Sequence, residues 1–468
     1  MSIVIGLTQS GTEIALQLSM ANRHGLITGA TGTGKTATLQ HMAEQFSSQG
    51  VAVFTADIKG DLAGLAFNAG SHMNAQPTKT AANPVILWDV FGQTGHPLHT
   101  TVREMGPLLL GRLLKLNDVQ QSILSIAFTI AQDRNTSLIN LTDLRNLLTL
   151  ILENNDALKT NYGYLPSHSI GAIQRALLLL NDSGTRNLFR EPIFDIHHLL
   201  KSAPNDKGYI HILDTRKLIQ DPLLYSTFLL ALLAQLFDKL PEVGDLPKPK
   251  LIFFFDEAHL LFKQAPQALL EKIEQWVRLV RSKGVGVYFV TQNPMDLPER
   301  VLGQLSNRIQ HSMRGFTIRA QRDLRAIVET FRPNLHVDTA YLITRLGVGE
   351  ALVSILDVHG VPSPVEHVRI IMPRSRMGVI SHDERKRLIE KSPFYFLQKP
   401  TQQKKPPTKP RKLAKESVKR QRSKPMQTAF SKRQTPLEAF LASAARSFGT
   451  QFARQIMRRL NRLFGKKR

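Results

Sequence analysis

Apolar positions along the first four hundred residues follow two spacings, one typical of buried strands and the other of helices. Short apolar runs predict strands at 3–5 and 14–16 (a hairpin), 25–28, 51–57, 85–89, 209–213, 251–255, 285–291, 309–313, 351–357 and 366–372. Apolar residues three and four apart predict helices between them, beginning with 35–48. Strands that alternate with helices indicate an α/β fold with a mostly parallel sheet covered on both faces.

Residues 100–205 interrupt this alternation. They show helical spacing, as in the runs 105–116 and 170–180, and contain no strong strand pattern. We therefore predict one α/β domain over residues 1–398, with a helical insertion at about 100–205.

The composition changes beyond residue 398. Pro, Lys, Arg, Gln and Ser dominate residues 399–435, so we expect a disordered basic linker there. In residues 436–468, aromatic and aliphatic side chains again fall four apart, opposite several arginines, which predicts a basic amphipathic helix. Such a helix can pack on the body, join subunits, lie on an anionic membrane or touch nucleic acid.

Charge follows the same division. The whole chain has a formal net charge of +24, but residues 399–468 alone hold 21 Lys and Arg against two Glu, a net +19. This leaves +5 for residues 1–398, so the basic character belongs mainly to the tail. Overall charge alone is therefore weak evidence for nucleic-acid binding, although a basic linker is a good non-specific partner for phosphates.

The chain contains no cysteine, which excludes disulfides, thiolate metal sites and cysteine nucleophiles. Its first residues lack the basic region of a signal peptide, and polar residues interrupt the longest apolar runs. The histidines lack paired ligand spacing, so we expect no zinc site or metal cluster. These features favour a cytoplasmic protein without a transmembrane segment.

A glycine-rich loop joins the strand at 25–28 to the helix at 35–48. It reads Gly29-Ala30-Thr31-Gly32-Thr33-Gly34-Lys35-Thr36. The spacing matches the phosphate-binding pattern known as Walker A, in which backbone N–H groups surround the phosphates at a helix N-terminus. We expect the whole loop to bind ATP, with Lys35 neutralising the β- and γ-phosphates and Thr36 ligating Mg²⁺.

Two acids follow the apolar strand at 251–255, where open α/β sheets bind ligands. Asp256 is the expected magnesium partner, and Glu257 the expected base that orients and deprotonates the attacking water. An Asp-Glu pair after a strand can also cap the following helix. Beside the glycine loop, however, the catalytic reading is favoured, and the pair then corresponds to Walker B.

The strand at 285–291 also ends in polar residues. Gln292 is placed to sense the γ-phosphate and help position the water, although a polar residue here can also be a plain loop cap.

Several segments resemble one branch of ring ATPases. The glycine loop, the run Asp57-Ile58-Lys59-Gly60-Asp61-Leu62, the strand end at Asp256-Glu257 and the run Thr291-Gln292-Asn293-Pro294 are similar to the HerA/FtsK branch of DNA-translocating ATPases. Three further runs are Glu104-Met105-Gly106-Pro107-Leu108-Leu109, Gly171-Ala172-Ile173-Gln174-Arg175 and Leu302-Gly303-Gln304-Leu305-Ser306-Asn307-Arg308. With them the chain more closely resembles the bacterial HerA-like proteins of the DUF853 (YjgR) family, over nearly its whole length. This resemblance implies a RecA-like core, homo-hexamers and ATP sites at subunit borders. Only about 20 residues precede the first core strand, whereas HerA itself carries an N-terminal β-barrel.

Ring ATPases of this branch complete each site with an arginine from the neighbouring subunit, which stabilises charge in the transition state. The candidates here are Arg308, then Arg281, with Arg278 and Arg314 as further choices.

These expectations favour an ATP-hydrolysing DNA translocase or helicase that uses ATP and Mg²⁺. Two alternatives remain open at this point. One is a P-loop NTPase that acts on protein partners, or as a switch, without DNA. The other is a membrane-surface scaffold gated by ATP, held through residues 436–464.

Overall fold

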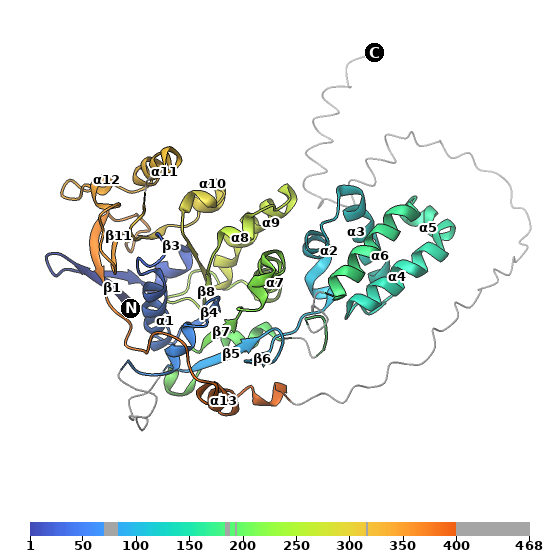
Figure 1. The fold of residues 1–468 in the computed structure, drawn as a ribbon, viewed down its shortest axis with the longest axis horizontal. Helices are drawn as coiled ribbons and strands as arrows, with labels where there is room; N and C mark the ends of the chain where they lie inside the picture. Colours follow the sequence, from blue (N-terminus) through green and yellow to red (C-terminus); the bar gives the residue numbers. More distant parts are fainter. Residues whose placement is uncertain (70–82, 183–187, 192–193, 315–316, 399–468) are drawn as a thin grey trace, which may run out of the picture. The chain divides into compact units, whose positions relative to one another are not determined.

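The computed structural model describes residues 1–69, 83–182, 188–191, 194–314 and 317–398. Twelve described strands form one sheet in the order β2-β1-β12-β11-β10-β3-β9-β8-β4-β7-β5-β6 (Figure 1). Their bounds are β1 Ser2–Thr8, β2 Glu13–Gln17, β3 Gly25–Thr28, β4 Ala52–Asp57, β5 Val85–Asp89, β6 His96–Pro97, β7 Ile210–Asp214, β8 Leu251–Phe255, β9 Val285–Thr291, β10 Asn307–Gln310, β11 Glu350–Ser354 and β12 Glu366–Ile370.

The strands from β10 to β6 run parallel to their neighbours, whereas β11, β12, β1 and β2 extend the sheet in antiparallel pairs. In the parallel part, β9 lies between β3 and β8. The carboxyl ends of β3, β9 and β8 therefore meet at one edge of the sheet, with the end of β9 in the middle. This order brings together three segments that are far apart in the sequence.

Successive side chains of the central strands point to opposite faces of the sheet and pack into two separate hydrophobic cores. Phe253 and Phe255 of β8 face one core, while Ile252 and Phe254 face the other. The first core is closed by α7 (Pro222–Lys239), α8 (His259–Phe262) and α9 (Gln267–Val280). The second is closed mainly by α1 (Lys35–Ser48). Both faces of the parallel sheet are thus covered, and the fold is of the RecA-like P-loop NTPase type.

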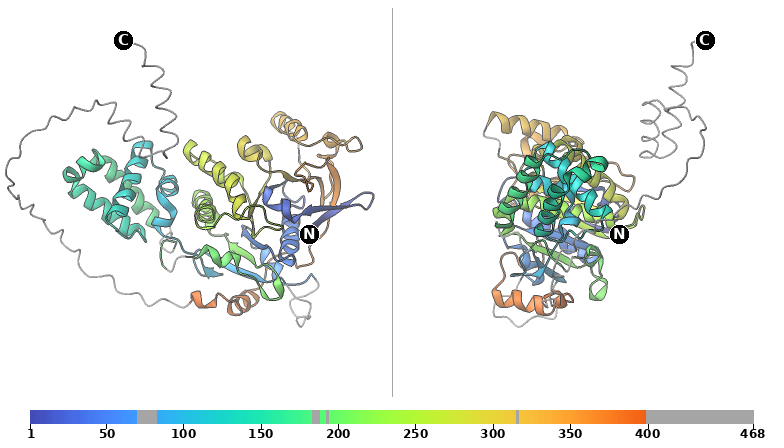
Figure 2. Two further views of the ribbon diagram at one scale, coloured as in Figure 1. Left: turned by 180° about the vertical axis from the view of Figure 1, so that it is seen from behind. Right: turned by 90° about the vertical axis from the view of Figure 1, so that its right-hand side faces the viewer.

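Five consecutive helices interrupt the α/β alternation. They are α2 (Val102–Leu113), α3 (Asp118–Asp133), α4 (Leu141–Glu153), α5 (Asn155–Tyr162) and α6 (Ser167–Asp182). Helix α2 packs on α7, and α3 to α6 form a bundle beyond it (Figure 2). Their apolar stripes join the same core as α7. The linker and amphipathic helix predicted at 399–468 lie outside the described residues.

The connection between β10 and β11 forms a small unit of its own. It contains α11 (Ile318–Glu329) and α12 (Thr339–Leu342), packed on a third core that includes Ile327, Phe331 and Ile343. The sequence pattern did not predict this unit. It also placed the preceding strand at 309–313, whereas β10 is Asn307–Gln310. Beyond Gln310, the backbone N–H of His311 donates to Thr28 O, and Ser312 O accepts from the glycine loop.

Among the described helices, none has the length and apolar character needed to cross a lipid bilayer.

Candidate active site

The glycine loop turns sharply between β3 and α1. Gly29 has φ +146°, and a Cβ there would lie 2.5 Å from the Cβ of His311. Gly34 has φ +118° and is the N-cap of α1. Side chains rarely adopt these backbone angles, so both positions require glycine. The loop therefore keeps its backbone N–H groups at the start of a helix, as phosphate binding needs.

The loop is held from behind by the segments that follow β10 and precede β11. Ala30 N donates to Ser312 O at 2.8 Å, and Gly349 N donates to Thr33 O at 3.1 Å. Buried His311 contacts Thr38 Oγ1 at 2.8 Å through Nε2 and Glu350 O at 2.9 Å through Nδ1. These bonds fix the loop and the first turns of α1 against the sheet.

Lys35 folds back over the loop. Its Nζ donates to Gly29 O at 2.7 Å and Ala30 O at 3.0 Å. Burial lowers the pKa of Lys35, and the nearby Glu257 and Asp256 charges act in the opposite direction. Because its hydrogen-bond partners among the described residues are carbonyl oxygens, the ammonium can exchange them for phosphate oxygens at little cost.

The backbone at the end of β8 is shaped to present two carboxylates. Asp256 Oδ1 accepts from Glu257 N at 2.9 Å, and buried Tyr225 of α7 donates its hydroxyl to Asp256 O at 2.8 Å. Glu257 has φ +47°, a left-handed conformation that costs a non-glycine residue about 1 kcal/mol or more. The Tyr225 hydrogen bond holds the neighbouring peptide in place and helps maintain this turn.

The turn directs Glu257 toward the end of β9. Gln292 Nε2 donates to Glu257 Oε1 at 3.4 Å, and His259 Nδ1 lies 3.3 Å from Glu257 Oε2. Glu257 and Gln292 are 35 positions apart in the chain and meet only because β8 and β9 are neighbours. The two residues expected to handle the attacking water thus lie in direct contact.

Asp256 is poised to receive a cation. Burial raises its pKa to about 7, and the Glu257 charge adds to this effect, while Glu257 N–H, Lys59 and Lys35 oppose it. A carboxylate that is costly to ionise in the free protein gains from a metal ion. The side chains of Asp256 and Thr36 line the same cavity and offer oxygen ligands, the type Mg²⁺ prefers, so the residues fit the expected metal.

These groups surround a cavity of about 470 Å³. Its polar wall includes the glycine loop, Lys35, Thr36, Asp256 and Glu257. Its apolar wall includes Val348, Met372 and Met377. One end therefore suits phosphates, and the other offers aliphatic contacts that suit a nucleotide base.

The sequence assigned no role to Lys59, yet its side chain is exposed and lines this cavity. It lies in a tight turn after β4, where Asp57 accepts hydrogen bonds from the backbone N–H groups of Gly60, Asp61 and Leu62. Within the described parts of the chain, its ammonium has no hydrogen-bond or ion-pair partner. In the sequence, the position of Lys59 two residues after a buried strand could have indicated a role at this edge of the sheet.

The candidate arginines lie outside the cavity. Arg308 donates to three carbonyl oxygens, those of Leu305 (3.1 Å), Thr330 (3.1 Å) and Leu302 (3.3 Å). Its guanidinium therefore ties β10 to the end of α11. Arg281 begins a short 3₁₀ turn, Arg281–Lys283, and its only ion pair in the described chain is a 3.3 Å contact with exposed Asp245.

The fold and the cavity together define a P-loop NTPase with a RecA-like core. Over residues 3–468 the sequence matches the family described as "Helicase HerA-like C-terminal", and the chain belongs to that family.

Two curated relatives are each named "DNA double-strand break repair helicase HerA". The protein of Sulfolobus acidocaldarius is 22% identical over 368 residues, covering 74% of this chain and 65% of the relative. That of Saccharolobus solfataricus is 22% identical over 359 residues, covering 74% and 64%. The chain thus spans just under two thirds of the length of these relatives.

Solved structures share the fold. The bacterial conjugative coupling protein TrwB covers 79% of this chain and 90% of its own, with a TM-score of 0.53 and 15% identity. VirB4 of Thermoanaerobacter pseudethanolicus covers 79% and 96%, also with a TM-score of 0.53 and 15% identity. A further TrwB structure is described as a complex with ADP and Mg²⁺.

Proposed function

We propose that this protein hydrolyses ATP and uses the energy to move DNA, as a ring of identical subunits. The observation that carries the hydrolysis is the contact of Gln292 with Glu257, which lines the same cavity as Lys35 and Asp256. A carboxylate beside an amide, facing a phosphate-binding loop, is an arrangement suited to hold one water molecule in line with the γ-phosphorus.

Each of these residues has a separate role in the reaction. Lys35 leaves the loop carbonyls and binds β- and γ-phosphate oxygens. Gln292 and Glu257 hold the water, and Glu257 accepts its proton as the new P–O bond forms and the bond to the β-phosphate oxygen breaks. ADP and inorganic phosphate are the products. Thr36, and Asp256 through water, would hold Mg²⁺, which would supply charge neutralisation at the phosphates.

Lys59 is a second cation for the γ-phosphate. Lys59→Ala is expected to weaken ATP binding roughly tenfold, the scale of one charge-assisted hydrogen bond, and to leave ADP binding unchanged. Equilibrium titration with the two nucleotides measures this difference. Lys59→Arg keeps the positive charge, so it should retain part of the ATP affinity that Lys59→Ala loses. Lys217→Ala removes an exposed lysine beyond β7 and serves as the control. Equal losses for ATP and ADP would contradict a γ-phosphate role.

We propose that a second subunit completes the site with a positive charge. Arg281 precedes β9, whereas Gln292 follows it, and seven strand residues separate the two ends by roughly 20 Å. Arg281 therefore cannot reach the cavity of its own subunit. Among the described residues Arg281 has one ion pair, which is exposed, so its guanidinium is available to a neighbour. Arg308 already donates to three carbonyl oxygens. We therefore place Arg281 first as the trans arginine.

The DNA assignment draws on the named relatives and on charge. The curated HerA relatives are described as DNA repair helicases, and the tail carries +19. A protein-directed NTPase and an ATP-gated membrane scaffold remain the competing functions. They differ in which polymer or surface accelerates ATP hydrolysis.

ATPase rates at low salt, with and without DNA, distinguish the three functions. The full chain is expected to be stimulated by DNA. A chain ending at Gln398 should bind DNA more weakly, with a flatter salt dependence, because it lacks most of the positive charge. It should still be stimulated if it assembles. Hydrolysis without DNA stimulation in the full chain would favour the protein-directed NTPase, and stimulation by anionic vesicles alone would favour the scaffold.

A further inference from the structure

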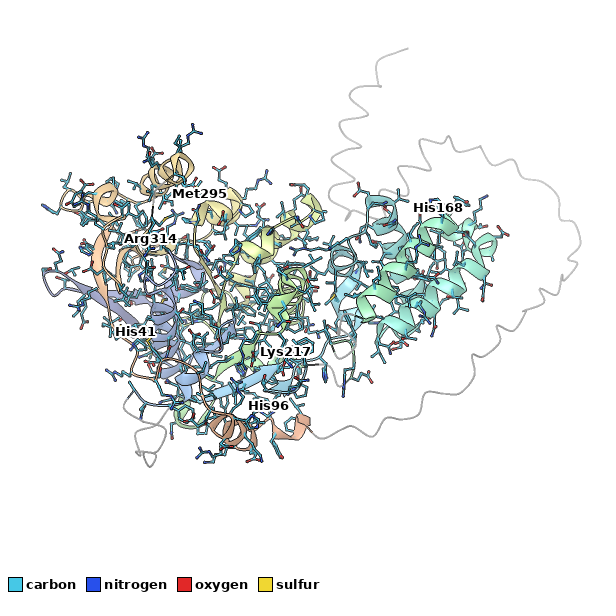
Figure 3. All side chains as sticks on the ribbon, viewed as in Figure 1. His41, His96, His168, Lys217, Met295 and Arg314 are labelled. Atoms are coloured by element: carbon cyan, nitrogen blue, oxygen red, sulfur yellow. The ribbon has the colours of Figure 1, made fainter. Side chains whose placement is uncertain are left out.

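The residue after Gln292 is bonded to a helix outside the active site. Asn293 Nδ2 donates to Asp323 Oδ2 of α11 at 2.8 Å, and Asn293 Oδ1 accepts from Met295 N at 3.0 Å. The 3₁₀ turn Pro294–Asp296 packs against α11, and Figure 3 shows Met295 beside that helix. A displacement of the end of β9 therefore acts directly on α11.

Helix α11 has one face turned inward and one turned to solvent. Ile327 is buried in the small third core, with Leu324 packed beside it. Arg322 and Arg325 lie on the opposite side and are exposed, in line with Ile318, which is 75% exposed. In the described part of the chain, neither guanidinium pairs with an acid. Asp323, the acid between them in sequence, is turned to Asn293.

The connection that contains α11 is one of the basic segments of the body. Residues 314–346 hold six arginines and three acids, a net +3 of the +5 carried by residues 1–398. The arginines are Arg314, Arg319, Arg322, Arg325, Arg332 and Arg345. Arg345 stacks 4.1 Å from the ring centroid of exposed Tyr341. Exposed arginines with an aromatic ring are a surface chemistry that suits a nucleic-acid backbone.

We propose that α11 binds the phosphate backbone of DNA through Arg322 and Arg325, and that the Asn293–Asp323 hydrogen bond couples this grip to the nucleotide state. This inference rests on the proposed DNA motor function and names the surface that it uses. Gln292 contacts the γ-phosphate, and a shift of Gln292 moves Asn293, the next residue in the chain. The hydrogen bond from Asn293 to Asp323 then transmits this movement to α11. By reciprocity, DNA bound to α11 changes the affinity of the site for the nucleotide. The same displacement of Gln292 changes its contact with Glu257, and so the rate of hydrolysis.

The first test removes the two cations. Arg322→Ala/Arg325→Ala is expected to lose most DNA stimulation of the ATPase and to lower the slope of log K against log salt by about 0.9 for each lost phosphate contact on duplex DNA. The control is Arg134→Ala/Arg145→Ala, which removes two exposed arginines from the helical insertion. Thermal melting establishes that both variants are folded. A salt slope that falls equally in both variants would overturn the assignment to α11.

The second test removes the Asn293–Asp323 hydrogen bond and keeps Arg322 and Arg325. Asp323→Ala removes the acceptor of the Asn293 hydrogen bond, so we expect DNA affinity to be kept while DNA stimulation of hydrolysis falls at least about fivefold. Asp323→Asn also removes the charge, but its amide oxygen can still accept. It should therefore retain stimulation, which separates the hydrogen bond from the charge.

The outcomes distinguish this inference from the function on which it rests. If the wild-type chain hydrolyses ATP but shows no response to DNA, the DNA motor function and the α11 surface are both wrong. If the wild type responds and all three α11 variants respond equally, only the α11 surface is wrong. A loss of subunit association in light scattering, with unchanged DNA affinity, would instead make α11 a contact between subunits and overturn the proposal.

Discussion

Glu257→Gln should bind ATP as the wild type does and hydrolyse it roughly 10² times more slowly or worse, the scale of a lost general base. Glutamine keeps the size of the side chain and can still contact Gln292, but it cannot accept the proton of the attacking water. Single-turnover hydrolysis and equilibrium binding of ATP, measured on the same preparation, separate the chemical step from affinity.

Two variants make this result specific. Lys35→Ala should lose affinity itself, because the phosphate charge is no longer neutralised. Tyr225→Phe keeps the buried ring but removes the hydroxyl that holds Asp256 O, so it should lower turnover less than Glu257→Gln does. A Glu257→Gln protein that hydrolyses ATP at the wild-type rate would show that the acid after β8 is not the base.

Arg281→Ala should lower turnover by about 10³, the lower range measured for arginines supplied in trans, without loss of ATP affinity. Because the proposed role of Arg281 is in the site of a neighbouring subunit, activity should return when this variant is mixed with Lys35→Ala. The first chain provides an intact loop and the second provides an intact arginine. Hydrolysis as a function of the mixing ratio measures this complementation.

Arg308→Ala is the comparison. Its guanidinium supports three carbonyls of its own subunit, so we expect a lower melting temperature and no rescue in mixed rings. Rescue of Arg308→Ala together with failure of Arg281→Ala would reverse the assignment. A monomer at micromolar concentration in light scattering, with full activity, would remove the need for any trans arginine.

The sequence was most informative where chemistry is encoded in consecutive residues. The loop from Gly29 to Thr36 and the pair Asp256-Glu257 each follow a strand directly, so both their identity and their place at the sheet edge could be predicted. The RecA-like fold and the HerA-like family were also predicted, and both are confirmed.

Features that depend on contacts across the fold were not predictable in this way. Tyr225 reaches Asp256 from a helix 31 residues earlier, and Asn293 meets Asp323 across 30 residues. The Arg308 guanidinium donates to three carbonyl oxygens, and one of them, Thr330 O, is 22 residues away in the chain. Spacing in one sequence carries no information about such pairs, since polar residues give no periodic signal.

The strand order also sets the sequence of events in folding. Strand β8, which carries the two acids, pairs with β4, although about two hundred residues separate them in the chain. Closing so long a loop is slow, and until it closes β3 lacks its neighbour β9 and β4 lacks its neighbour β8. Helices α2 to α6, by contrast, are built from local contacts and can form while the rest is still being synthesised. Until then the nascent chain exposes the apolar residues of β3 and β4, which favours aggregation before β8 and β9 are complete.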